Sequence, residues 1–270
     1  MLSVAMIGRN ESGTLAAALQ SVRPFASEII FIDTGSNDAT PTIAAAHGAK
    51  VISFNWEDDF SKARNFALEN CSCRWVLSLD CDEVVRPLTQ TARFFSNLAK
   101  DEMSLGYKVN IENRLPGGLL SSHEDIRLFR NIPEIIYRNP IHESVSESVY
   151  KLRVHEPLSE AGFLIHHDGY ASSERNREKL SRNLRILKRW IEISPDEPFA
   201  WYKLGMTLKA VSADESVACL FRSFELLLSR DDRNSFAFRF ELVQVLVESL
   251  RDVDQSISQL IQSEGIRAFA

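Results

Sequence analysis

The stretch Trp75-Val-Leu-Ser-Leu-Asp80-Cys-Asp82-Glu83 joins an apolar run, typical of a buried strand, to three carboxylates. Alternate residues of an extended chain point to opposite sides, so Asp80 and Asp82 are expected on the same side. Two carboxylates that face the same way could bind a divalent cation or a metal-bound phosphate. The start of a helix, which attracts acidic side chains, would explain the cluster without a ligand.

The residues before this cluster alternate short apolar runs with segments typical of helices. This rhythm predicts an α/β fold, a parallel sheet covered by helices. Strands are expected at residues 2–7, 28–32, 49–54 and 75–79. In such sheets the ligand crevice lies beyond the carboxyl ends of the strands. Polar residues gather after all of these strands, at 8–11, 33–38, 55–60 and 80–83.

The pattern changes twice further along the chain. Short alternating runs from 105 to 167 predict the mixed or antiparallel half of the same domain. From residue 173 the chain has a helical pattern, so we expect an α/β domain at 1–172 and an all-helical region at 173–270. One apolar helix face is predicted from spacings of four, three and four between Leu180, Leu184, Leu187 and Ile191.

The helical region contains Trp201-Tyr-Lys-Leu204-Gly205, followed by Ala218, Phe221 and Phe224. This order approximates the opening and the helical pair of a tetratricopeptide repeat (TPR). One unit fits the pattern well, so we interpret the region as a TPR-like helical extension rather than a repeat array.

The composition is that of a globular protein. Of 270 residues, 44% are hydrophobic, which is enough for a full core. The formal net charge of -6 disfavours nucleic acid as a partner. The first residues lack the pattern of a secretion signal and no apolar run reaches 18 residues, so a cytoplasmic location is expected. The cysteines fit neither zinc nor disulfide spacing and are expected to be reduced: Cys71, Cys73, Cys81 and Cys219.

Asp33 ends the expected second strand, within Ile32-Asp33-Thr-Gly35-Ser36-Asn-Asp38. The glycine and small polar residues would let a ribose or a base edge approach the backbone. An Asp-containing turn explains Asp38 fully and Asp33 less easily. The letters D-T-G-S also occur in aspartic proteases, but that mechanism needs two facing aspartates. We reject this match because the chain has one D-T-G and the rhythm of a parallel sheet.

Arg64 lies near the start of an expected helix, in Asp58-Asp59-Phe-Ser-Lys-Ala-Arg64-Asn65. Its planar guanidinium could make paired hydrogen bonds to an anionic phosphate. It could equally pair with Asp58 or Asp59, and the spacing does not choose between the two.

The acidic cluster also fits D-x-D-x-[TV], through Asp80-Cys-Asp82-Glu-Val84. In haloacid dehalogenase (HAD) phosphatases the first aspartate of this pattern attacks a phosphoryl group. There the motif lies on the first strand, whereas here it follows the fourth. A HAD-like phosphatase is therefore the weaker alternative.

Several of these motifs together resemble family 2 glycosyltransferases of the GT-A fold, a Rossmann-like mixed sheet. The similar branch includes lipopolysaccharide-core glucosyltransferases and SunS-like peptide glycosyltransferases. The matches run in order over residues 2–190: Asn10-Glu11, the segments around Asp33, Arg64 and Asp80, Arg127-Leu-Phe-Arg130, Pro140-Ile-His142-Glu143 and Ile165-His-His167-Asp-Gly169-Tyr170.

The resemblance implies transfer of a sugar from a nucleotide-diphosphate donor, a UDP-sugar, with inversion at the anomeric carbon. Asp82 would bind Mn2+ or Mg2+, which neutralises charge on the departing diphosphate. Asp80 would contact the ribose or the metal, and Glu83 would cap the next segment. Residues implied at the nucleotide-sugar donor are Asn10, Glu11, Asp33, Arg64 and Asp80.

An inverting displacement also needs a base within hydrogen-bond reach of the acceptor. The resemblance makes Glu143 and His142 the catalytic candidates, with Glu143 preferred. A His-Glu pair that stabilises a loop is the alternative. His167 resembles the late histidine that completes a metal site in some GT-A enzymes, and a structural histidine would explain it as well.

Two residues depart from the family pattern. Members usually have a small residue where this chain has Cys81, and usually a lysine near Arg9. By strand alternation Cys81 should point away from both aspartates, and Arg9 keeps the positive charge, so both changes look tolerable.

Seven cationic side chains lie between residues 175 and 189. They could attract an anionic acceptor, such as phosphorylated lipopolysaccharide core, or make peripheral contact with the inner face of a membrane. A solvated helix face explains them without a partner. A saccharide, lipopolysaccharide-core or peptide acceptor is expected. The competing class is an inactive, nucleotide-binding scaffold whose TPR-like helices bind a partner.

Overall fold

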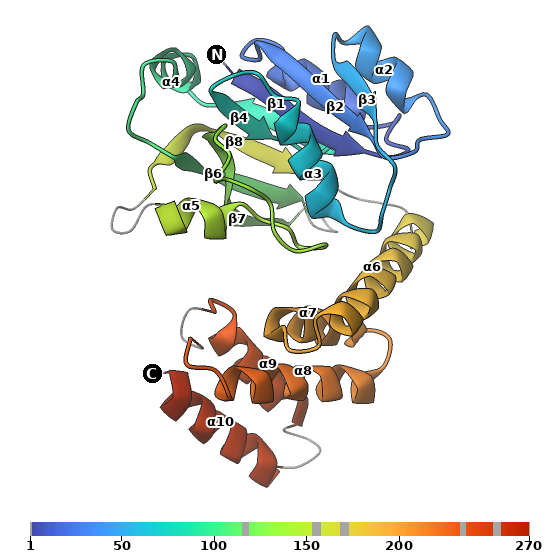
Figure 1. Ribbon diagram of the computed structural model, residues 1–270, viewed down its shortest axis with the longest axis vertical. Coiled ribbons are helices and arrows are strands. Elements are labelled where there is room, and N and C mark those ends of the chain that lie inside the picture. Colours follow the sequence, from blue (N-terminus) through green and yellow to red (C-terminus); the bar gives the residue numbers. More distant parts are fainter. Residues whose placement is uncertain are drawn as a thin grey trace. The chain divides into compact units, whose positions relative to one another are not determined.

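The computed structural model describes residues 2–114, 119–152, 158–167, 173–232, 236–250 and 255–269. The chain divides into two compact units, Met1–Ala171 and Ser172–Ala270. The first is a mixed sheet flanked by helices, and the second is helical (Figure 1). The residues after His167 in the last family motif lie outside the described ranges.

Parallel strands form at the four predicted places. Strand β1 pairs in parallel with β2 on one side and β4 on the other, and β3 pairs with β2. The predicted parallel sheet is therefore confirmed. The strands are β1 (Leu2–Gly8), β2 (Glu28–Asp33), β3 (Lys50–Ser53) and β4 (Trp75–Ser78). The helices between them are α1 (Leu15–Val22), α2 (Thr40–Ala46) and α3 (Phe60–Glu69).

The rest of the first unit extends the same sheet in mixed orientation, as predicted. The strand order is β3-β2-β1-β4-β7-β6-β8-β5. Strand β7 is antiparallel to β4 and β6, β8 is parallel to β6, and β5 is antiparallel to β8. The bounds are β5 (Glu83–Pro87), β6 (Gly106–Arg114), β7 (Leu120–Arg130), β8 (Glu160–His167), α4 (Thr91–Leu98) and α5 (Ser146–Leu152).

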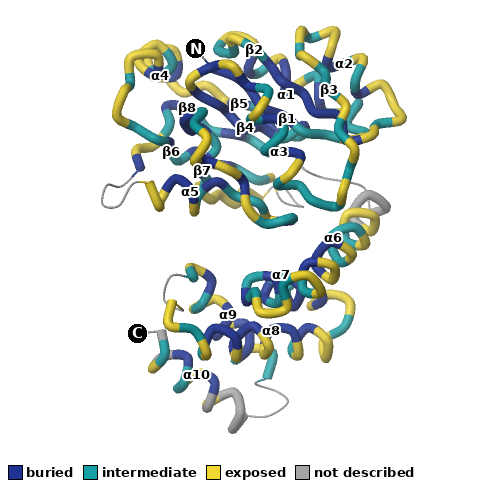
Figure 2. Tube along the Cα trace, in the orientation of Figure 1, coloured by how far each residue is buried: buried dark blue, intermediate teal, exposed yellow. Residues whose placement is uncertain are grey.

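Both faces of β1, β2 and β4 are largely buried, because helices cover both sides of the sheet, whereas the edge strand β3 exposes Lys50 and Ser53. Alternate residues feed different clusters: Val4 and Met6 pack on one face, and Ala5 packs on the other. Trp75 is fully buried and its indole N–H donates to the carbonyl of Leu98 at 3.0 Å. Figure 2 shows this burial along the strands. The core thus fixes the strand ends from which the polar residues project.

The second unit consists of the helices α6 to α10. Between residues 177 and 193 of α6, where burial is described, Ile186, Leu187 and Trp190 are buried, so the predicted face is only partly right. Its other predicted members are only half-buried, because Trp190 turns the face toward Phe199 of α7, with ring centroids 6.2 Å apart. The bounds are α6 (Ser173–Ile193), α7 (Pro198–Leu208), α8 (Ala213–Leu228), α9 (Arg239–Leu250) and α10 (Gln255–Phe269).

Close helix packing in this unit depends on glycine. At Gly205 of α7 a Cβ atom would lie 2.7 Å from Leu220 Cγ and 3.0 Å from the carbonyl oxygen of Ser216, both on α8. Gly265 of α10 meets Val243 of α9 in the same way, at 2.6 Å. Gly205 is the glycine of the W-x2-L-G pattern, whereas the pair formed by α9 and α10 lacks that pattern. Neither contact was predicted from the sequence.

We predict that Gly205→Val destabilises the helical unit. Overpacking costs roughly 1–3 kcal/mol, and valine recovers little of it through helix propensity. Urea unfolding followed by circular dichroism at 222 nm measures the loss. Gly13→Val is the control, because a Cβ at Gly13 meets no atom within 4 Å, and its effect should stay within about 0.5 kcal/mol. Equal stability of the two variants would contradict the packing argument.

Candidate functional site

The loops that follow β1 and β2 are joined by hydrogen bonds. The backbone N–H of Asn10 donates to Ser36 Oγ at 3.0 Å, and Asn10 Oδ1 accepts from the N–H of Asn37 at 2.9 Å. The N–H of Glu11 donates to Thr40 Oγ1 at 2.7 Å. Asn10 has a φ of 58°, a left-handed conformation that asparagine tolerates better than most residues. Asn10 and Glu11 therefore lie beside the turn that follows Asp33.

Asp33 is buried at the end of β2, where its Oδ1 accepts from the N–H of Ser36 at 3.0 Å. Gly35, at φ 102°, lets the turn form. Asp38 accepts from the N–H groups of Thr40 and Ser12 at 2.9 and 3.3 Å. Burial alone would raise the pKa of Asp38, but hydrogen bonds with Thr40 and Ser12 lower this pKa to about 2. Both aspartates therefore shape the turn, and Asp33 alone is buried against β1.

Arg64 is a buried cation at the centre of the site. Its Nε donates to Glu143 Oε1 at 2.6 Å, Nη2 donates to Asp80 Oδ1 at 2.8 Å, and Nη1 donates to Ser78 Oγ at 3.1 Å. Burial opposes its charge, but Asp80 and Glu143 raise the pKa of Arg64 well above its usual value. Arg64 therefore pairs with Asp80 and Glu143 rather than with Asp58 or Asp59, an alternative that the spacing had left open, because α3 turns it toward β4.

The loop that carries the two catalytic candidates is anchored to α3. The side chain of Asn65 bonds to both the N–H and the carbonyl of Tyr137, at 2.8 and 2.9 Å. Glu143 has an 11% exposed side chain against Arg64. His142 is exposed and has a φ of 56°, an uncommon backbone conformation that often occurs at functional sites. The structure thus brings Glu143 into the cluster with Asp80 and leaves His142 at the surface.

Arg127 and Glu83 are central residues to which the sequence analysis gave no site role. Arg127 Nη2 donates to Glu83 Oε1 at 3.1 Å, and Nη1 lies 3.7 Å from Asp80 Oδ2. Glu83 Oε2 accepts from the backbone N–H of Asp80 at 2.8 Å. Glu83 therefore holds the preceding turn and starts β5, rather than capping a later segment as predicted. The sequence feature that could have indicated a site role for Arg127 was its place in the family motif Arg127-Leu-Phe-Arg130.

Burial affects the carboxylates of this cluster differently. Burial raises the pKa of Glu83 to about 7, against the opposing effect of Arg127. At Asp80 burial acts in the same sense, but Arg64 and Arg127 outweigh it and hold the pKa well below its usual range. Asp80 is therefore the ionised partner of both arginines, and Glu83 titrates near neutrality.

Asp82 and His167 face each other beside this cluster. Asp82 Oδ2 lies 3.3 Å from His167 Nε2, and His167 Nδ1 lies 2.9 Å from Asn113 Oδ1. The pairing of β5 with β8 sets Glu83 opposite His167, which brings the end of β8 to the acidic turn. The hydrogen bond with Asp82 raises the pKa of His167, although burial opposes it.

Asp82 and His167 could together supply two ligands to a divalent cation whose remaining ligands come from the substrate. A carboxylate oxygen of Asp82 and an imidazole nitrogen of His167 lie side by side, and the two side chains are 23% and 32% exposed. The other imidazole nitrogen is held by Asn113. In the described ranges no cluster of three potential ligands could hold a metal by itself. Mn2+ or Mg2+ would therefore need further ligands from substrate phosphates, which is usual for Mg2+.

Cys81 points away from these ligands, as predicted. Its Sγ donates to the carbonyl of Ile7 at 3.3 Å, and it packs against Gly8. All four cysteines lie in the described ranges, where they are buried and form no disulfide. In the same part of the chain, no helix is both long and apolar enough to cross a bilayer.

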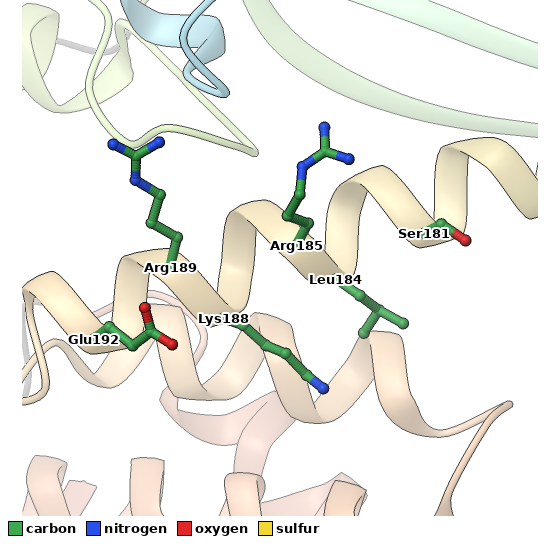
Figure 3. A pocket seen from close by; sticks show the side chains of 6 residues that line it. All are labelled: Ser181, Leu184, Arg185, Lys188, Arg189 and Glu192. Atoms are coloured by element: carbon green, nitrogen blue, oxygen red, sulfur yellow. The ribbon is translucent and has the colours of Figure 1, made fainter.

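A separate shallow hollow lies on α6 in the helical unit (Figure 3). Arg185 and Arg189 extend from it in the same direction, one turn apart. The helix carries seven basic and three acidic residues, a formal charge of +4 in a chain of -6. The lining residues are Ser181, Leu184, Arg185, Lys188, Arg189 and Glu192.

Comparison with known proteins supports one family. The family model described as glycosyl transferase family 2 matches residues 3–142. A TPR repeat-containing protein of Synechococcus elongatus is 35% identical over 76% of this chain and 51% of its own length. The SPbeta prophage-derived glycosyltransferase SunS of Bacillus subtilis is 26% identical over 79% of this chain and 50% of its own length. This chain spans about half the length of these curated relatives.

A solved structure shares the fold. TarS of S. aureus, residues 1–349 in complex with UDP-GlcNAc, superposes with a TM-score of 0.56 at 12% identity, over 98% of this chain and 89% of that chain. This likeness supports the GT-A fold predicted from the motifs, and the family model covers more than half of the sequence. The chain belongs to glycosyl transferase family 2.

Proposed function

We propose that this chain is a metal-dependent, inverting glycosyltransferase that moves a sugar from a UDP-sugar to a saccharide, lipopolysaccharide-core or peptide acceptor. The proposal rests above all on the Asp82–His167 pair, which lies beside Asp80 in a member of this family. The pair supplies part of a metal site, and a diphosphate would complete it. An incomplete site of this kind suits an ion that arrives with its substrate.

The donor would lie across the carboxyl ends of the parallel strands. Asn10, Glu11 and Asp33 border the turn where a nucleoside would bind, and Asp80 lies further along the same edge. Arg64 would not contact the donor directly, since its guanidinium is occupied by two carboxylates, and would instead hold Asp80 in place. When bound, Mn2+ or Mg2+ would neutralise the negative charge that develops on the departing diphosphate.

Glu143 is the preferred base. Its Oε1 is anchored by Arg64, and within the described part of the chain Oε2 receives no hydrogen bond. Oε2 would take the proton of the acceptor hydroxyl as that oxygen attacks the anomeric carbon. The bond from that carbon to the diphosphate breaks on the opposite face, which inverts the configuration. His142, exposed on the same loop, is the second candidate.

The inactive scaffold remains the competing function, and the close packing of α7 on α8 at Gly205 is the observation that favours it. A protein that binds UDP with Mn2+ but neither hydrolyses nor transfers any UDP-sugar would favour it. The HAD-like phosphatase is not supported, because Arg64 and Arg127 hold the aspartate that would have to attack phosphate.

We predict that Asp82→Asn lowers metal-dependent hydrolysis of UDP-sugar about 100-fold, the usual cost of losing a group that stabilises leaving-group charge. Coupled detection of released UDP, with and without Mn2+, measures this. Asp214→Asn makes the same change at an exposed residue of α8 and should leave the rate unchanged. If Asp82→Asn keeps the wild-type rate, the proposed metal site is wrong.

We predict that Glu143→Gln lowers kcat roughly 100-fold or more, the usual contribution of a general base. Glutamine can still accept from Arg64, so the KM for the donor should not change. Steady-state kinetics measure both constants. His142→Ala should cost less than about tenfold, since only the preferred base should show the full effect. The reverse order of the two variants would make His142 the base.

The basic side chains of α6 support contact with an anionic acceptor or membrane surface. We predict that replacing Arg185, Lys188 and Arg189 by serine weakens such contact by about 100-fold, from about 1 kcal/mol per residue near an anionic surface. Sedimentation with anionic lipid vesicles tests the membrane, and the KM of a phosphorylated oligosaccharide tests the acceptor. The control replaces the exposed cations Arg23, Arg93 and Lys100. If the two triple variants do not differ in vesicle binding or in the KM of the acceptor, the basic face of α6 is a solvated surface without a partner.

A further inference from the structure

A line of side chains runs outward from Asp82 across the edge of the sheet. His167 Nε2 faces Asp82 Oδ2 at 3.3 Å, and His167 Nδ1 meets Asn113 Oδ1 at 2.9 Å. The Nδ2 group of the same asparagine reaches His123 Nδ1 at 3.2 Å. Asn113 thus lies between two histidines on different strands, one of which is the candidate metal ligand.

Strand pairing fixes this arrangement. Strand β6 lies between β7 and β8, and Asn113 is in register with His167 of the parallel neighbour β8. On the other side β7 is antiparallel, and His123 is opposite Ile111, which puts its ring diagonally next to Asn113. Asn113 is half-buried and therefore partly shielded from water. The backbone places the amide between the imidazoles.

The amide group has unlike ends, and this determines what each histidine can do. Its oxygen only accepts, so the facing Nδ1 of His167 must carry a proton. In neutral imidazole a proton on Nδ1 leaves a lone pair on Nε2, the form that binds a metal. Nε2 is the atom that faces Asp82.

We propose that Asn113 is a positioning residue that holds His167 in the Nδ1-protonated form and aims Nε2 at the metal site shared with Asp82. This inference rests on the metal binding in the proposed function. Partners of this kind fix the ring and the tautomer of metal-binding histidines, and their loss usually costs 10–100-fold in metal affinity. Asparagine does so without adding another negative charge to the cluster.

Paired variants at Asn113 separate the acceptor from the donor end of the amide. Asn113→Leu removes both ends at similar volume and should weaken Mn2+ binding about 10–100-fold at saturating UDP. Asn113→Asp keeps an acceptor oxygen toward His167 and should stay within about threefold of the wild type. The electron paramagnetic resonance signal of free Mn2+ measures binding without requiring activity. Asn110→Leu, at an exposed position on β6, is the control.

The wild-type protein offers a second test that no folding defect can obscure. Long-range proton–nitrogen NMR spectra, recorded with UDP and Mg2+, report which nitrogen of His167 is protonated. We expect Nδ1. Protonation at Nε2 would overturn the proposal, as would equal weakening in Asn113→Leu and Asn113→Asp, or none in Asn113→Leu.

Failure of the proposed function gives a different result. If wild-type protein with UDP binds no Mn2+, or if His167→Ala binds it unchanged, the metal site itself is wrong and the role of Asn113 falls with it. If wild-type binding is strong and His167→Ala loses it, the metal site stands, and the Asn113 variants alone decide the inference.

Discussion

The site is built around the buried guanidinium of Arg64, which holds Asp80 on one side and Glu143 on the other. Buried charges are expensive to desolvate, and breaking a buried ion pair by removing one partner typically costs about 3–5 kcal/mol. The contact therefore ties α3, the end of β4 and the loop of Glu143 into one arrangement. The same cation therefore positions Asp80, proposed to lie at the donor, and Glu143, the proposed base.

The charges around this contact do not balance. The guanidinium groups of Arg64 and Arg127 face four carboxylates, those of Asp80, Glu83, Asp125 and Glu143. The cluster keeps a negative excess even when Glu83 takes up a proton near neutrality. Asp82 adds a further carboxylate beside it, and such an excess favours a divalent cation next to the cluster. The same surplus explains why a neutral asparagine, rather than another acid, suits the position behind His167.

Local patterns in the sequence were sufficient for much of the fold. Apolar runs predicted the parallel strands and the polar turns at their carboxyl ends, because burial on both faces requires such runs. Strand β5 was not predicted, because it is short and includes charged residues. The ion pair of Glu83 with Arg127 offsets the free energy needed to bury that carboxylate, and pairing with β8 stabilises the strand. The prediction of the apolar face of α6 was only partly right, because the packing of Trp190 on α7 shifts the buried face toward Ile186.

The residue types of the site were visible in the amino-acid sequence alone: an acidic turn after a buried strand, an arginine at a helix start, and later histidine and glutamate motifs. Which of these groups meet was decided by the tertiary structure. Arg64 binds carboxylates that are distant in the sequence rather than its neighbours Asp58 and Asp59. Glu83 accepts a hydrogen bond from the backbone N–H of Asp80 and so holds that turn, and Asn113 contacts His167. The reason is physical: spacing along a strand or helix sets which side a group faces, whereas its partner depends on strand order and register in the folded sheet.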